Sequence, residues 1–261
     1  MDETFLQFYS SDRLLVPTGT KRVGTLVPVE NEKKGVTVAV SASLLASRLL
    51  PPFIIDTGVF GADLMKHWSH YNKSKILFNN TFWMTHYVFI LYSTWISNTF
   101  PDSKTLLIVD RSTTHFGPLI TEWLENNHSS TGGKVWIEYI SEGMTSILQV
   151  CDIAINKPLK AHVHKAYFDF RLQAIQNLTA KQLTDSVFTV PRENLFEMIE
   201  NAFELINQQN YRRQWIADAF EKCGQNPWVE GDSKFEAHLA SLNENCVYQH
   251  MKEGNQTLKL F

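Results

Sequence analysis

The chain has 261 residues, of which 44% are hydrophobic and 12% aromatic, so it can bury one large core, or one core with a helical appendage. Its 24 lysines and arginines against 27 aspartates and glutamates give a net charge of -3, which excludes a protein that is basic overall and binds nucleic acid over its whole surface. The three cysteines (Cys151, Cys223 and Cys246) form no C-x-x-C pair and are typical of reduced thiols inside a cell. The most apolar stretch, residues 82–100, is interrupted by polar side chains, so we expect neither a membrane span nor secretion.

The first third of the sequence alternates β-branched runs with polar turns, which predicts a meander of strands. The predicted strands cover residues 2–9, 22–29, 36–42 and 51–55, with a connection over residues 43–50. A short helix over residues 61–69 and a strand over residues 75–78 follow. The Pro51-Pro52 pair suits the start of a strand because proline lacks an N–H donor.

From residue 81 the apolar period becomes helical, which predicts a helix to residue 99 with Trp83, Tyr87 and Trp95 packed in the core. A strand (106–110), a helix (118–126) and a strand (135–139) come next, and this alternation predicts a parallel pair with a right-handed crossover. Further helices are predicted over residues 156–177, 192–206 and 211–223. We expect residues 1–225 to form one domain and residues 226–261 to form a polar tail with one helix at 234–242.

Three aspartates fall at the edges of predicted elements. Asp2 begins the first strand, Asp110 ends the apolar strand, and Asp152 stands where a long helix begins. Carboxylates delivered by separate elements are what a two-metal phosphoryl-transfer site needs. They are 108 and 42 residues apart, so only the tertiary fold can bring them together. Glu3 should point to the opposite face of the strand from Asp2, which predicts a poor ligand.

Several stretches carry a more specific signal. They are Met1-Asp2-Glu3-Thr4, Pro51-Pro52, Leu106 to Asp110 followed by His115, and Gly143 to Lys160, which includes Asp152 and Asn156-Lys157-Pro158. These stretches resemble the DDE superfamily endonucleases, in particular the pogo, Tigger and jerky type of transposases and transposase-derived proteins related to mariner. The resemblance spans roughly residues 1 to 225. It implies an α/β fold with a ribonuclease-H-like mixed sheet, flanking helices and a helical C-terminal extension.

The same resemblance implies a site. In that family an acidic triad binds two divalent cations, Mg²⁺ or Mn²⁺, and the matching positions are Asp2, Asp110 and Asp152. Where the family has a proline and an aliphatic residue before its third acid, this chain has Val150 and Cys151. The family's helix-turn-helix region and the start of its first strand have no counterpart here, so we expect an N-terminally truncated domain.

Other residues are candidates for supporting roles. Basic side chains follow the third acid at helical spacing and are candidates for contacting DNA phosphates; they are Lys157, Lys160, His164, Lys165 and Arg171. A solvated helix face explains them equally well. His115 is a possible auxiliary that orients a phosphate or an aspartate, although a cap or loop contact is the simpler role. Asp110 alone would also suit a turn, and Cys151 is expected to be structural.

Two classes of function follow. The first is a transposase-derived catalytic domain for two-metal DNA phosphodiester cleavage and strand transfer, which the truncation should impair. We expect such a chain to bind Mn²⁺ through Asp110 and Asp152 yet to show little or no strand cleavage. The second is a non-catalytic DNA- or chromatin-associated protein, or a decaying transposon remnant. In either class the expected partner is DNA, a homodimer is a possible assembly, and the expected location is the nucleus.

Overall fold

The computed structural model describes residues 1–7, 35–57, 73–101, 103–131, 135–176, 190–229, 231 and 233–242. The predicted strand at 22–29 and the predicted helix at 61–69 lie outside these ranges. Within them, every helix is too short or too polar to cross a membrane.

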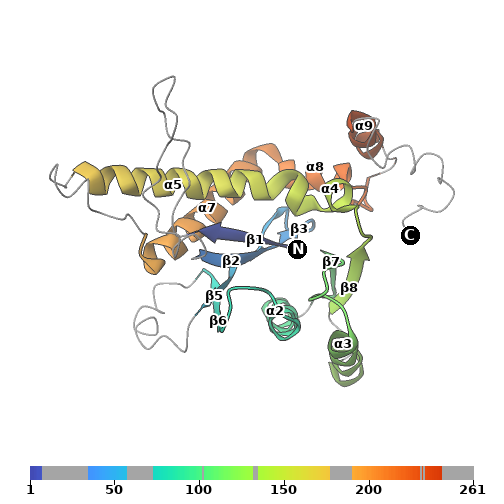
Figure 1. Ribbon diagram of the computed structural model, residues 1–261. Coiled ribbons are helices and arrows are strands. Elements are labelled where there is room, and N and C mark those ends of the chain that lie inside the picture. Colours follow the sequence, from blue (N-terminus) through green and yellow to red (C-terminus); the bar gives the residue numbers. More distant parts are fainter. Residues whose placement is uncertain are drawn as a thin grey trace, which may run out of the picture.

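The main sheet has the order β1-β2-β5-β6 and is mixed (Figure 1). Its strands are β1 (Asp2–Gln7), β2 (Gly35–Val40), β5 (Phe53–Thr57) and β6 (Lys75–Asn79). β1 and β5 both pair antiparallel with β2, and β6 pairs parallel with β5. Every residue of β2 is buried, and this strand lies between the other strands with helices on both faces, which explains its continuous β-branched sequence.

A small hairpin of β3 (Ala42–Ser43) and β4 (Arg48–Leu49) occupies most of the stretch 43–50 that was predicted as a connection. The side chain of Asn207 holds this hairpin, since its Oδ1 accepts from the Leu49 N–H at 2.7 Å and its Nδ2 donates to the Leu49 carbonyl at 3.2 Å. The strand character of such short segments depends on this distant side chain, which explains why the local sequence did not predict it.

A second, parallel pair consists of β7 (Thr105–Asp110) and β8 (Val135–Ile140), joined through α3 (Pro118–Thr131). The predicted parallel pair is therefore confirmed. The Met1 amino group donates to the Ile108 carbonyl at 2.8 Å, so the start of β1 lies against β7.

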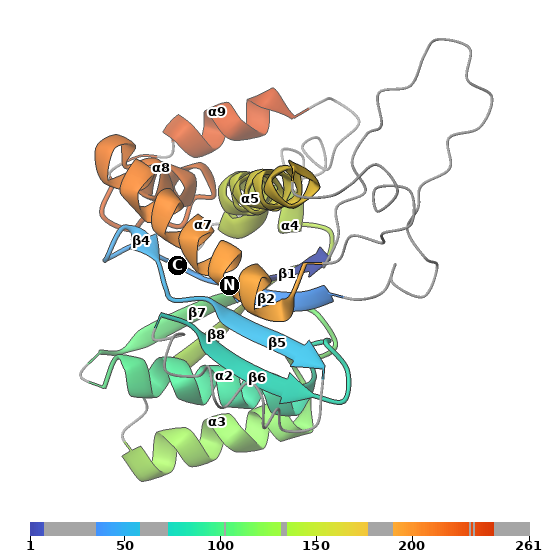
Figure 2. The same ribbon diagram turned by 90° about the vertical axis from the view of Figure 1, so that its left-hand side faces the viewer.

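Helices cover both faces of the strands (Figure 2). On one face α5 (Asn156–Gln176) and α7 (Arg192–Arg213) pack on a core that includes Leu6 and Val38. On the other face α2 (His86–Thr99) packs on a separate core that includes Ala39 and Ile55. The strand residues of the two cores alternate along β2, as a pleated strand requires. This arrangement confirms the mixed α/β, ribonuclease-H-like fold predicted from the sequence.

The predicted core face of α2 is wrong in part. Trp83, which precedes the helix, is 55% exposed and Tyr87 is 69% exposed, whereas Val88, Phe89, Tyr92, Ser93 and Ile96 are buried. Aromatic residues occur on several sides of this helix, so its apolar period did not select a single face. Packing against Phe53, whose ring lies 5.2 Å from that of Tyr92, determines which side is buried.

The C-terminal helices differ from the prediction at one boundary. α7 continues to Arg213, past the predicted end at residue 206, and the chain turns at Gln214, which has a left-handed φ of 49°. Asn210 stabilises this turn because its Oδ1 accepts from the Ile216 N–H at 2.8 Å at the start of α8 (Trp215–Lys222). α9 (Ser233–Ser241) agrees with the helix predicted at 234–242.

Candidate metal centre

The side-chain amide of Asn156 joins two of the three predicted carboxylates. Its Nδ2 donates to Asp2 Oδ2 and also to Asp152 Oδ1, the latter at 3.0 Å. Asp2 and Asn156 are 154 residues apart in the chain, so this contact exists only in the folded protein. Two carboxylates that share one NH₂ group lie within about 6 Å of each other.

The local path of the chain explains how Asp152 and Asn156 reach this position. The short helix α4 (Thr145–Leu148) ends at Gln149, which is extended, and a π-helix (η3, Cys151–Ile155) then leads directly into α5. The Asn156 N–H donates to the Cys151 carbonyl across this wider turn. Residues four apart lie on one side of a helix, so both side chains face β1. A π-turn inside a helix frequently marks a functional site.

The electrostatics of this pair favour a nearby cation. Burial and then the Asp152 carboxylate raise the pKa of Asp2 to about 7, although the hydrogen bond from Asn156 opposes the shift. Two like charges held together in a partly desolvated place are unfavourable without a counter-ion. A divalent cation would relieve this repulsion.

Asp110 belongs to a second group of side chains at the end of β7. His115 is fully buried, and its Nδ1 lies 2.8 Å from Asp110 Oδ1 and 3.1 Å from the Asp110 carbonyl. Its Nε2 lies 2.7 Å from Glu3 Oε1. Burial alone lowers the pKa of His115, but the Asp110 and Glu3 carboxylates outweigh it and raise this pKa to about 10. The imidazolium therefore binds β1 to the end of β7.

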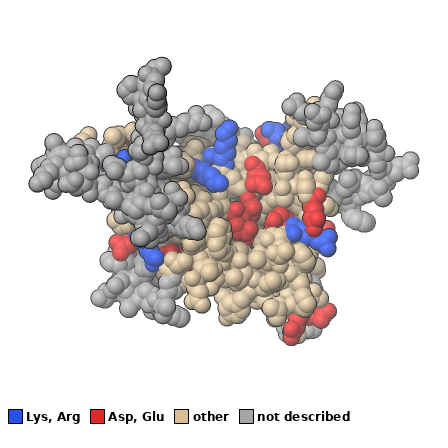
Figure 3. Space-filling model, in the orientation of Figure 1, with Lys and Arg blue, Asp and Glu red and all other residues tan. Residues whose placement is uncertain are grey.

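Strand geometry relates these two groups to each other. Ile108 packs with the α4 residues Ile147 and Leu148, and Asp110, two residues further along β7, lies on that same face. Asp2 lies on the α5 face of β1, while its neighbour Glu3 lies on the other face, as the alternation predicted. The structure thus joins Asp2 to Asp152 through Asn156, and it joins Asp110 to the adjacent residue of β1 through His115. Figure 3 shows acidic side chains gathered near the middle of this side of the molecule.

The donor atoms present fit a hard divalent cation. Asp2, Asp152 and Asn156 offer oxygen atoms, and Glu3, Asp110 and His115 have ligand atoms within 4.8 Å of one another. Oxygen-rich sites of this kind suit Mg²⁺ or Mn²⁺. The ring nitrogens of His115 both face carboxylates, 2.8 Å from Asp110 Oδ1 and 2.7 Å from Glu3 Oε1, and these carboxylates raise the pKa of the ring. This arrangement suits a side chain that orients carboxylates. Glu3 and His115 were underestimated from the sequence, since only the fold brings them together.

Cys151 does not belong to the site, although it precedes Asp152. Its Sγ donates to the Val40 carbonyl at 3.5 Å, and burial raises the pKa of its thiol to about 11. The structural role predicted for Cys151 agrees with these contacts.

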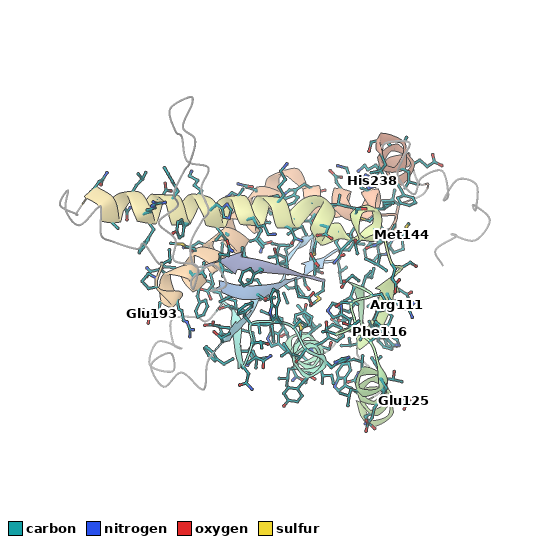
Figure 4. The ribbon with its side chains drawn as sticks, in the orientation of Figure 1. Arg111, Phe116, Glu125, Met144, Glu193 and His238 are labelled. Atoms are coloured by element: carbon teal, nitrogen blue, oxygen red, sulfur yellow. The ribbon has the colours of Figure 1, made fainter. Side chains whose placement is uncertain are left out.

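Basic side chains flank the carboxylates. Lys157, Lys160, His164 and Lys165 are exposed on α5, and Arg171 is partly exposed further along the same helix. Arg111, directly after Asp110, is also exposed, and its guanidinium lies 5.4 Å from the centre of the Phe116 ring. Figure 4 shows Arg111 and Phe116 near the end of β7, with Glu125 further away on α3. This surface combines anionic ligands with nearby cationic groups.

A protein-family model for DDE superfamily endonucleases matches residues 33–215, which is more than half of the chain. The chain belongs to this family. The match contains Asp110, Asp152 and Asn156, and it begins after β1, so Asp2 lies outside it. No curated protein matches the chain. No solved structure matches it either.

Membership of the DDE superfamily endonucleases agrees with the resemblance described from the short stretches around Asp110 and Asp152. The family is one of nucleases, so DNA is the implied substrate class. The acidic groups described above are where a member of this family would be expected to hold divalent metal.

Proposed function

We propose that this DDE superfamily endonuclease domain cleaves DNA phosphodiester bonds and transfers strands with two divalent cations, as the pogo, Tigger and jerky type of transposase does. One observation carries the proposal. Carboxylates from the first strand and from the π-helix share the amide of Asn156, and the Met1 amino group joins the start of that strand to β7, the strand that ends in Asp110.

The chain's own residues would divide the work. Asp2, Asp110 and Asp152 would hold the cations, and the His115 imidazolium would fix the direction of the Asp110 carboxylate. When bound, the two cations would activate the attacking water or 3′-hydroxyl and stabilise the leaving oxygen. The exposed basic residues of α5 would contact phosphates on either side of the scissile bond.

The order of β1 bears on activity. A loosely held Asp2 would weaken catalysis, because a misplacement of about 1 Å can reduce the rate roughly a hundredfold. In the structure, however, β1 pairs with β2 from Asp2 to Gln7, and the Met1 amino group is bonded to Ile108. These contacts would hold the Asp2 carboxylate in place. We therefore expect slow but measurable cleavage of DNA.

The test is nicking of supercoiled DNA in Mn²⁺ by the wild-type chain and by Asp110→Asn. We expect slow nicking that EDTA abolishes and that Asp110→Asn lacks. Glu125→Gln is the matched control, because it removes a carboxylate from the exposed surface of α3, away from the site. Nicking that survives Asp110→Asn would refute the assigned site.

A non-catalytic DNA- or chromatin-associated role is the alternative. Mn²⁺ binding without any nicking, together with retained DNA binding, would favour it. DNA as the substrate supports a nuclear location, which a fluorescent fusion would test. The family resemblance supports a homodimer, which light scattering in solution would test.

A further inference from the structure

The amide of Asn156 leaves one of its own atoms without a partner. This residue is only 9% exposed. Its Nδ2 donates to two carboxylates, but its Oδ1 has no hydrogen-bond donor within the described part of the chain. A buried carbonyl oxygen without a donor is unfavourable, so each such group calls for an explanation.

We propose that Asn156 is a further ligand of the metal centre, and that its amide rotates on cation binding so that Oδ1 takes the position of Nδ2. The inference rests on the proposed function, because it requires a divalent cation between Asp2 and Asp152. Without a cation, the NH₂ group faces the carboxylates and reduces their repulsion. With a cation, the carbonyl oxygen becomes the better neighbour, since all three groups then present oxygen to the metal.

The distances suit this exchange without movement of the backbone. In an octahedral Mg²⁺ site the ligand oxygens lie 2.0–2.1 Å from the ion, so adjacent ligands are roughly 3 Å apart. Asn156 Nδ2 is 3.0 Å from Asp152 Oδ1. Rotation of the amide alone therefore gives two oxygens the spacing of adjacent ligands.

The backbone of Asn156 is held where this rotation requires it. Its N–H is bonded to the Cys151 carbonyl at the junction of η3 and α5, and Ile155 beside it is fully buried. The side chain is thus the part that can change. An amide has nearly the same shape in both orientations, so the rotation needs little additional space.

Two variants separate ligation from hydrogen bonding. Asn156→Asp keeps an oxygen at the position and removes the donor, whereas Asn156→Leu removes both at similar volume. Mn²⁺ affinity is measured by calorimetry on the full chain for both variants and the wild type. We expect Asn156→Leu to weaken Mn²⁺ binding by about tenfold or more and Asn156→Asp to bind at least as tightly as the wild type.

The midpoint temperature of thermal unfolding gives a second test of ligation by Asn156. In EDTA, Asn156→Asp should unfold at a lower temperature than Asn156→Leu, because three carboxylates would then repel one another. Saturating Mn²⁺ should raise the midpoint of Asn156→Asp more than that of Asn156→Leu. A purely structural Asn156 would give an Asn156→Leu variant whose midpoint Mn²⁺ raises as much as that of the wild type.

Side-chain amide NMR observes the rotation directly. On titration with Mg²⁺, the NH₂ signals of Asn156 should move as their bonds to Asp2 and Asp152 are lost. The signals of Asn207, whose amide is bonded to Leu49, should stay in place. The absence of the Asn156 signals in Asn156→Leu identifies them.

The outcomes are distinct. Equal weakening of Mn²⁺ binding in both variants, or unmoved NH₂ signals while Mg²⁺ binds, would show that Asn156 acts only as a donor and would overturn this inference alone. No Mn²⁺ binding by the wild type would overturn both this inference and the proposed function.

Discussion

Replacing His115 with glutamine should remove a pH dependence of stability that the wild-type chain possesses. In the folded state the Asp110 and Glu3 carboxylates raise the pKa of His115 from 6.5 to about 10. A raised histidine pKa stabilises the folded state fully below pH 6.5, and that stabilisation is lost as pH rises toward 10. Glutamine does not titrate, so the variant should lack this loss.

The size of the effect follows from the pKa difference. One pKa unit corresponds to about 1.4 kcal/mol. Between pH 6.5 and 9 the wild type should therefore lose at most roughly 3 kcal/mol of its free energy of unfolding through His115. The Glu3 and Asp110 side chains are 20% and 26% exposed, and water weakens their interaction with the imidazolium. We therefore expect the wild type to lose about 2 kcal/mol more than His115→Gln over this interval.

Urea unfolding in EDTA at pH 6 and pH 9, followed by circular dichroism, measures this difference. Both proteins keep the buried thiols Cys151 and Cys223, so the contribution of those groups cancels. His164→Gln is the matched control, because His164 is exposed on α5 and this variant should follow the wild type. Parallel loss of stability in the wild type and His115→Gln would refute the charged bridge between Glu3 and Asp110.

Three further predictions concern DNA and the core. The chain should bind duplex DNA weakly and without sequence preference, and Lys157→Gln with Lys160→Gln should reduce the salt dependence of a gel-shift titration by a slope of about 2; an unchanged slope would exclude this face of α5. Phe196→Ala should cost about 3–5 kcal/mol in urea unfolding, because Phe196 of α7 is fully buried in the core that α5 and α7 share with the sheet. Asn210→Ala should cost about 1–3 kcal/mol in the same assay, because it leaves the buried Ile216 N–H without its acceptor; a loss near zero would mean that the α7–α8 turn stabilises itself.

The sequence predicted the elements that have a strong local pattern. The apolar run ending at Asp110 is β7, the β-branched run from Gly35 is β2, and the long helix after Asp152 is α5. Backbone preference and the alternation of buried and exposed side chains act over a few residues, so such elements can be recognised without tertiary information. The strand start at Asp2 and the parallel β7–β8 pair were predictable for the same reason.

Other features depended on partners far away in the chain. The β3–β4 hairpin depends on Asn207, the end of α7 depends on Asn210, and the buried side of α2 depends on Phe53. Where several local backbone conformations or helix orientations have similar free energy, a contact with a distant residue selects one of them. Local sequence therefore gave the approximate position of these elements but not their boundaries or buried faces.

The candidate metal centre shows the same division. From the sequence alone, Asp2, Asp110 and Asp152 could be proposed as a set, because each carboxylate stands at the edge of an element and the surrounding residues resemble one family. Only the tertiary structure gave the bridging side chains, since the Asn156 amide bonds to a residue 154 positions away and His115 bonds to one 112 positions away. Hydrogen bonds and charge interactions act over a few ångströms in space, whatever the separation in sequence, so the folded chain alone determines which groups share a proton donor or could share a cation.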